Sequence, residues 1–322
     1  MYKLSRYKDL LPALCAMLLP AIAVADVFPL LPGDSVVGAI GRVQAVYEDT
    51  LIDIGRRHGV GYTEITAANP DVDVWLPGAN TEVLLPTRFV LPESPRDGLV
   101  VNIAEYRVYY YPPAADGEVP RVSTFPISIG RMDWGTPLGR AAIVAKATDP
   151  AWYPPESIRA EHAAEGRPLP RIVPPGPDNP LGRHALRLSV PGYLIHGTNR
   201  PAGIGMRVTH GCIRMYPEDI AWLYPQVNLK TPVQLVNQPY KMGWSGDELL
   251  LEVHAPLSDD DLATGRGLTQ ITQLYVSATA GRAAEVDWDR IETAYRERRG
   301  VPVVVGRAAE RPSVVSIGDL SR

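Results

Sequence analysis

Cysteine is scarce in this chain. Its 322 residues include only two cysteines, Cys15 and Cys212, which excludes a network of disulfides and a Cys-x-x-Cys metal site. The sequence also lacks a phosphate-binding loop, carboxylates spaced to hold a metal ion, and internal repeats, so it predicts no cofactor and no metal. The formal net charge of −4, with 21% charged and 45% hydrophobic residues, fits a folded globular protein and argues against a nucleic-acid partner.

Residues 1–25 carry the features of a secretory signal peptide. A basic start leads into an apolar stretch that ends in the small-x-small cleavage site Ala23-Val24-Ala25. The stretch is short for a transmembrane helix and contains two prolines. Cys15 lies inside it, and because Leu14 precedes this cysteine instead of a small residue, a lipoprotein signal is disfavoured. Cleavage leaves Cys212 as the only cysteine, and an unpaired cysteine in an oxidising compartment is either buried or reactive.

The remaining cysteine belongs to a segment rich in histidine and glycine, Tyr193–Met215. A thiol is mostly protonated at neutral pH, so a cysteine nucleophile needs a base or a positive environment to activate it. His196 follows an apolar strand and is free to approach Cys212 from a neighbouring segment, whereas His210 is only two residues away and is constrained locally. The backbone N–H groups of Gly211 and Cys212 are candidate donors to an oxyanion.

Other interpretations of these residues stay open. A lone cysteine is most often a small buried hydrophobe, and a histidine after an apolar strand is most often a core residue with one hydrogen bond. Zinc accepts ligands such as His196, His210 and Cys212, but no fourth ligand is visible. The three residues together, with glycine around them, favour nucleophilic catalysis.

The motifs His196-Gly197-Thr198-Asn199 and Thr209-His210-Gly211-Cys212-Ile213-Arg214 resemble the active-site signature of the L,D-transpeptidases, cysteine enzymes that remodel bacterial peptidoglycan. The resemblance is greatest to the periplasmic Gram-negative branch, which implies a periplasmic protein. It implies that Cys212 attacks the carbonyl of the third residue of a tetrapeptide stem, a diaminopimelate. It also implies that His196 passes the thiol proton to the departing D-alanine, and that the carbonyl of Gly197 or of a neighbour orients the imidazole. For His210 it implies that the side chain shapes the loop, with a role as a hydrogen-bond donor as the alternative.

The substrate of such an enzyme carries carboxylates, so we expect a cationic side chain in the cleft. Arg214, two residues after Cys212, and Arg207 are the nearest candidates, because a planar guanidinium matches a carboxylate. We place Thr209 in the same substrate-binding set. The alternative is that each arginine pairs with a structural acid such as Glu218.

The resemblance implies two partners for the acyl-enzyme. The side-chain amine of a second stem would give a 3→3 crosslink, and the C-terminal lysine of an outer-membrane lipoprotein would give a wall anchor. We favour the lipoprotein, because the resemblance covers the N-terminal module, the catalytic domain and the start of the C-terminal part together. A non-catalytic peptidoglycan-binding protein and a cysteine peptidase are the other function classes that fit the sequence.

A small separate module is predicted for residues 27–92, with a strand at Val43–Tyr47, a helix capped by Asp49, a helix over Thr63–Ala68 and a strand at Val83–Pro86. The module resembles LysM, a strand-helix-helix-strand binder of glycan. The matching residues are Asp49-Thr50-Leu51, Ile54, His58-Gly59-Val60, Asn69 and Pro77-Gly78. Glu48 and Asn80 depart from that pattern, so a spacer domain without sugar binding is the alternative.

The predicted fold class is mainly β, with a sandwich or barrel-like L,D-transpeptidase domain over residues 97–237, short helices, and the small α+β module before it. The Pro-rich segment 149–182 is expected to be an ordered wall of the cleft. Pro217 predicts the start of a helix. A C-terminal subdomain is expected at 238–305, with a helix capped by Asp287, followed by a mobile tail at 306–322.

Overall fold

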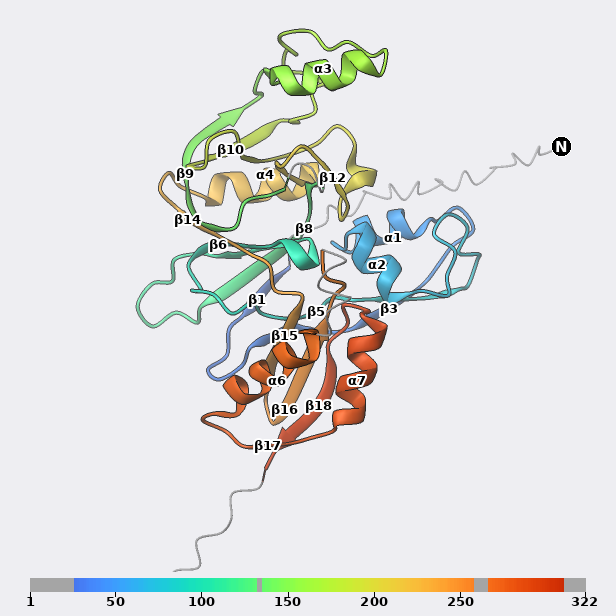
Figure 1. Ribbon diagram of the computed structural model, residues 1–322, viewed down its shortest axis with the longest axis vertical. Coiled ribbons are helices and arrows are strands. Elements are labelled where there is room, and N and C mark those ends of the chain that lie inside the picture. Colours follow the sequence, from blue (N-terminus) through green and yellow to red (C-terminus); the bar gives the residue numbers. More distant parts are fainter. Residues whose placement is uncertain (1–25, 132–134, 258–265, 310–322) are drawn as a thin grey trace, which may run out of the picture.

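A computed structural model describes residues 26–131, 135–257 and 266–309 of the chain (Figure 1). Three parts follow one another: the blue N-terminal module, the green and yellow central domain, and the orange and red C-terminal part. The predicted signal peptide lies outside the described residues. Within the described ranges, no helix is long and apolar enough to cross a membrane.

The central domain is a closed, barrel-like sheet, which confirms the mainly β prediction. Its path is β1-β8-β13-β11-β10-β9-β14-β6-β7, and a pairing between β7 and β8 closes it, while β12 pairs with β8 at the side. The strands are β1 (Val27–Pro29), β6 (Gly98–Asn102), β7 (Arg107–Tyr111), β8 (Arg121–Gly130), β9 (Gly139–Thr148), β10 (His184–Leu188), β11 (Leu194–His196), β12 (Arg207–Thr209), β13 (Ile213–Met215) and β14 (Pro232–Val236). β1, from the segment assigned to the module, therefore belongs to the central sheet.

The main core fills this sheet. Alternate residues of the strands point inward, so Ile127, Ile195 and Ile213 are buried in one cluster. Helix α4 (Pro217–Gln226) begins at the predicted proline and buries Ile220 and Leu223 against that cluster. The strands that carry the histidine and the cysteine motif are thus fixed from their apolar side.

The N-terminal module has the expected order of elements, β3 (Gly41–Gln44), α1 (Leu51–Arg57), α2 (Tyr62–Ala68) and β4 (Glu82–Leu85). It has a hydrophobic core of its own. The predicted cap of α1 is wrong: Thr50 caps the helix by accepting the Asp53 N–H, because Asp49 instead accepts the Val46 N–H and pairs with Arg57. The first strand also ends earlier than predicted, at Gln44. A second pair, β2 (Val36–Gly38) with β5 (Arg88–Val90), leads out of the module.

The module docks directly on the Gly-rich segment between the two site histidines. The N–H groups of Tyr62 and Thr63, at the start of α2, donate to the carbonyls of Ile204 and Gly205 at 2.9 and 3.3 Å. Gly205 has a φ of +89°, and a Cβ there would lie 2.2 Å from the Tyr62 nitrogen, so only glycine permits this approach. The module therefore fixes the chain that leads from His196 to Cys212.

The C-terminal part forms its own sheet, in the order β15-β16-β18-β17, with two helices and a separate core. Its elements are β15 (Tyr240–Ser245), β16 (Glu248–Val253), α6 (Arg266–Thr279), β17 (Ala284–Val286), α7 (Trp288–Glu297) and β18 (Val303–Ala308). Asp287 caps α7 as predicted. β18 runs past residue 306, so the predicted tail cannot begin there, because residues 306–308 pair with β16 and β17. Residues 310–322 lie outside the described ranges.

The segment 149–182 carries a helix that the sequence did not predict, α3 (Glu156–Ala164). Asn179 holds the end of the segment together: its amide donates to the carbonyls of Pro150 and Pro174, and its oxygen accepts the Leu181 N–H at 2.9 Å. The central domain also contains two short 3-10 turns, η1 (Ile103–Glu105) and η3 (Pro201–Gly203).

Candidate active site

His196 and Cys212 come together because β11 and β13 are parallel neighbours. Ile195 pairs with Ile213, and His196 pairs with Arg214. Both isoleucines point into the core, so the residues that alternate with them point to the other side of the sheet. His196, Cys212 and Arg214 therefore share one face, which is the juxtaposition that nucleophilic catalysis requires.

His196 is a buried, neutral imidazole with a defined tautomer. Its Nδ1 lies 2.6 Å from the Gly197 carbonyl oxygen, and since a carbonyl only accepts, Nδ1 carries the hydrogen. Burial and the positive charge of Arg214 lower the pKa of His196 to about 3, although the carbonyls of Gly197 and Leu181 favour the charged form. Nε2 is thus an unprotonated base at neutral pH.

Cys212 is half-buried and protonated in the resting protein. Burial raises the pKa of its thiol, and the Leu194 N–H and the Arg214 charge oppose this effect only in part. The thiol points to the Gly192 carbonyl, with an Sγ–O distance of 3.7 Å. No hydrogen bond between Cys212 and His196 is present in the described part of the chain, so the resting pair is a thiol and a neutral imidazole.

The turn that ends at Cys212 is held by hydroxyl groups. Gly211 has a φ of +97°, which glycine adopts without strain. Its carbonyl accepts the Thr136 hydroxyl at 3.0 Å, and the Cys212 carbonyl accepts the Thr209 hydroxyl at 2.6 Å. Among the described residues, nothing accepts the backbone N–H groups of Gly211 and Cys212. These two donors are free to bind an oxygen anion near the sulfur.

Arg214 has no carboxylate partner within the described ranges. Glu218, the expected structural acid, instead pairs with Arg56 at 2.8 and 3.0 Å. The Nε of Arg214 is buried and makes no hydrogen bond, and burial lowers the pKa of the guanidinium. A half-buried, unpaired cation on the Cys212 face is the arrangement expected of a carboxylate-binding group.

The other predicted site residues contact the protein itself. Arg207 donates to the Leu257 carbonyl at 2.7 Å, at the junction with the C-terminal part. The Thr209 hydroxyl donates to the Cys212 carbonyl. The side chain of His210 points toward α3, where its Nε2 lies 2.9 Å from Glu161 Oε2. The substrate-binding roles of Arg207 and Thr209 stay predictions.

Sequence reasoning did not assign roles to several groups around the pair. The main-chain groups of Leu181, Gly192 and Leu194 contact the imidazole or the thiol, and Thr136 fixes the Gly211 carbonyl. Two of these segments share a pattern in the sequence that could have pointed to them, Pro-Leu-Gly at 137–139 and at 180–182. Main-chain contacts leave no trace in side-chain identity, so the sequence carried no signal for Gly192 and Leu194.

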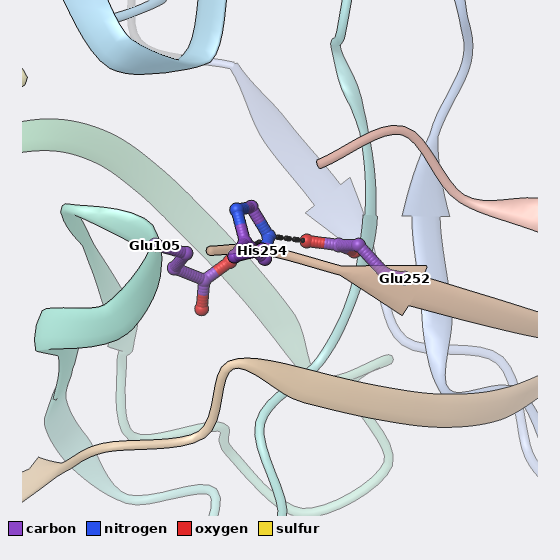
Figure 2. A group of neighbouring side chains, drawn as sticks. All are labelled: Glu105, Glu252 and His254. Carbon is purple, nitrogen blue, oxygen red and sulfur yellow. Dashed lines mark hydrogen bonds and ion pairs between the residues drawn. The ribbon is translucent and has the colours of Figure 1, made fainter. Parts of the chain in front are cut away.

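A candidate metal centre lies elsewhere, at Glu105, Glu252 and His254 (Figure 2). Among the described residues, this is the only such group whose ligand atoms gather closely enough, so His196, His210 and Cys212 do not form one. The ammonium of Lys241 lies 2.5 Å from Glu105 and 2.9 Å from Glu252. A lysine already occupies the position of a cation, so the cluster is an ion-pair network that joins the central and C-terminal parts.

Comparisons with known proteins agree with this geometry. The family model YkuD, the L,D-transpeptidase catalytic domain, matches residues 96–235. Probable L,D-transpeptidase YcfS of Escherichia coli K12 is 37% identical over 97% of this chain and 98% of its own length. Probable L,D-transpeptidase ErfK/SrfK of Salmonella typhimurium is 35% identical over 92% and 96%, and Probable L,D-transpeptidase YbiS of E. coli K12 is 38% identical over 76% and 79%. The matches to YcfS and ErfK/SrfK cover the module and the C-terminal part as well as the sheet, and the chain belongs to the L,D-transpeptidase family of peptidoglycan enzymes.

Proposed function

We propose that this protein is a periplasmic, cysteine-dependent L,D-transpeptidase that acts on tetrapeptide stems and attaches an outer-membrane lipoprotein to the wall. The observation that carries the catalytic part is the shared face of β11 and β13, where a neutral imidazole and a thiol lie beside an unpaired guanidinium. The pattern of residues 1–25 supports export.

Acylation begins when the Cys212 side chain turns from the Gly192 carbonyl toward His196. Nε2 takes the thiol proton as sulfur attacks the carbonyl carbon of the third stem residue. The resulting oxyanion is bound by the N–H groups of Gly211 and Cys212. The bond to D-alanine breaks, His196 gives its proton to the departing amine, and a thioester is left on Cys212.

Arg214 couples donor binding to this proton transfer. In the free protein its charge disfavours the imidazolium, because two positive groups share one face. A stem carboxylate paired with Arg214 cancels that repulsion and raises the proton affinity of His196. The base therefore becomes stronger when the donor is in place, which limits proton transfer in the empty site.

Transfer to the acceptor reverses these steps. A primary amine attacks the thioester and loses a proton to His196, the new amide bond forms, and the carbon–sulfur bond breaks to return the thiol. The C-terminal lysine of a lipoprotein and the side chain of a second stem both supply such an amine. We favour the lipoprotein, because similarity to the family runs through all three parts of the chain.

The N-terminal module holds the enzyme on glycan in this proposal. Tyr47 and Trp75 are 83% and 63% exposed, and they lie on the loop before α1 and the loop after α2. The two loops are joined by the bond from the Leu51 N–H to the Val74 carbonyl, at 2.9 Å. Exposed aromatic rings on adjacent loops are suited to stacking against sugar rings.

The proposal is tested by muropeptide analysis of a strain that lacks this protein, complemented with the native chain or with Cys212→Ala. We expect loss of lipoprotein-modified muropeptides, unchanged 3→3 dimers, and restoration by the native chain alone. Loss of the dimers with intact lipoprotein attachment would reassign the acceptor. Restoration by Cys212→Ala would eliminate the cysteine mechanism.

A further inference from the structure

Three side chains from distant segments meet beside the nucleophile turn. Glu161, on α3, places Oε1 2.7 Å from Arg131 Nη2 and Oε2 2.9 Å from His210 Nε2. The Arg131 and His210 nitrogens are 3.1 Å apart. Since Glu161 only accepts when ionised, both neighbours donate to it, and they hold the pKa of this carboxyl below its usual value.

The helix that carries Glu161 has little else to hold it. Figure 1 shows α3 outside β9 and β10, at the end of the molecule opposite the C-terminal part. Ile158 is its only buried residue, and none of its side chains joins a hydrophobic cluster. The Trp152–Val173 bridge and the Asn179 bonds join the two ends of the segment on either side of α3 and do not involve the helix itself. Glu161 is therefore the side chain through which α3 contacts Arg131 and His210.

The partners of Glu161 are continuous with the catalytic turn. His210 precedes Gly211 and Cys212 directly. The Arg131 N–H donates to the Thr209 carbonyl at 2.9 Å, so the main chain of Arg131 is hydrogen-bonded to the start of the same turn. A carboxylate that binds both side chains sets the position of the turn from the α3 side, while the Thr136 hydroxyl binds the Gly211 carbonyl in the same turn.

We propose that Glu161 is a positioning residue for acyl transfer, which ties α3 to the His210-Gly211-Cys212 turn and holds the oxyanion donors and the sulfur in register. The inference rests on the proposed role of Cys212 as nucleophile. In this proposal, His210 is the side chain through which α3 fixes the position of the turn. Glu161 itself touches neither the sulfur nor the substrate.

The test uses the mature protein and a tetrapeptide stem in single-turnover acylation. Glu161→Gln keeps the shape and removes the charge, and we expect the limiting acylation rate to fall about 10- to 100-fold, the cost of a small misplacement. The half-saturating stem concentration and the melting temperature should hardly change, because a partly exposed ion pair contributes little to stability. Glu165→Gln is the matched control, since Glu165 directly follows the same helix and, among the described residues, pairs with exposed Arg167 alone.

A second variant separates positioning from simple loss of packing. If Glu161 acts through His210, adding His210→Gln to Glu161→Gln should slow acylation no further than the slower single variant. Independent, multiplied losses, or a Glu161→Gln rate equal to that of Glu165→Gln, would overturn the proposal. Acylation of Cys212→Ser would instead disprove the cysteine mechanism, so the two failures are distinguishable.

Discussion

Two charged centres in this protein, one buried and one half-buried, are built in opposite ways. At the junction with the C-terminal part, Lys241 is 2% exposed, and Glu105, Glu252 and the Val90 carbonyl surround its ammonium. Burial opposes its charge, but the two carboxylates outweigh burial and raise its pKa. At the candidate active site, Arg214 has no carboxylate partner among the described residues, and burial lowers its pKa. A structural centre satisfies its charges internally, whereas a binding centre leaves one charge for the ligand.

The largest expected difference between the two centres is in stability. Lys241→Met removes the ammonium between Glu105 and Glu252 and leaves the two buried carboxylates beside His254, and we expect the free energy of unfolding to drop by about 3–5 kcal/mol. Arg214→Met breaks no ion pair and should cost far less. Urea denaturation of both variants checks this. Equal losses would mean that Arg214 has a structural partner after all.

Activity should show the reverse order. Arg214→Lys keeps the charge but loses the planar fork, so we expect kcat/KM for the stem donor to fall about 10- to 100-fold, as for a lost hydrogen bond to a charged group. Its melting temperature should stay near that of the native protein. Arg56→Lys, which alters the pair with Glu218 instead, serves as the control. A large loss of folding stability in Arg214→Lys with unchanged kinetics would contradict the binding role.

The active-site centre should also make folding sensitive to acid. The pKa of His196 is lowered to about 3 from an ordinary 6.5, so below pH 6.5 the unfolded chain binds a proton that the folded chain cannot. Stability from this group is therefore complete above pH 6.5 and is lost as pH falls toward 3. Between pH 7 and pH 5 we expect the native protein to lose about 2 kcal/mol more than His196→Gln. Parallel stability curves for the two proteins would show that His196 is not buried as described.

Local sequence signals predicted the elements that local chemistry determines. Pro217 and Asp287 start their helices as expected, because a missing N–H and a capping carboxylate act on their own turn. Asp49 did not cap α1, since Arg57 at the end of the same helix and the Val46 N–H competed for its carboxylate. The α3 helix went unpredicted because prolines on both sides of it dominate the composition of its segment.

The site divides in the same way. Cys212 and His196 could be paired from sequence, since His196 follows an apolar strand and the two motifs bring histidine, cysteine and glycine together within one segment. The contact of Glu161 with His210 could not, because it joins two segments 49 positions apart that share no pattern. Arg207 is close to Cys212 in sequence, yet β12 pairs with β8 outside the β11–β13 pair and carries its guanidinium to Leu257.

The central claim is that Cys212 forms the acyl-enzyme, with His196 as the base that takes its proton. Intact mass spectrometry after incubation with a stem tetrapeptide or a carbapenem tests it most directly. We expect one covalent adduct on the native mature protein, strongly slowed formation in His196→Gln, and none in Cys212→Ser. An adduct on Cys212→Ser as rapid as on the native protein would contradict the account.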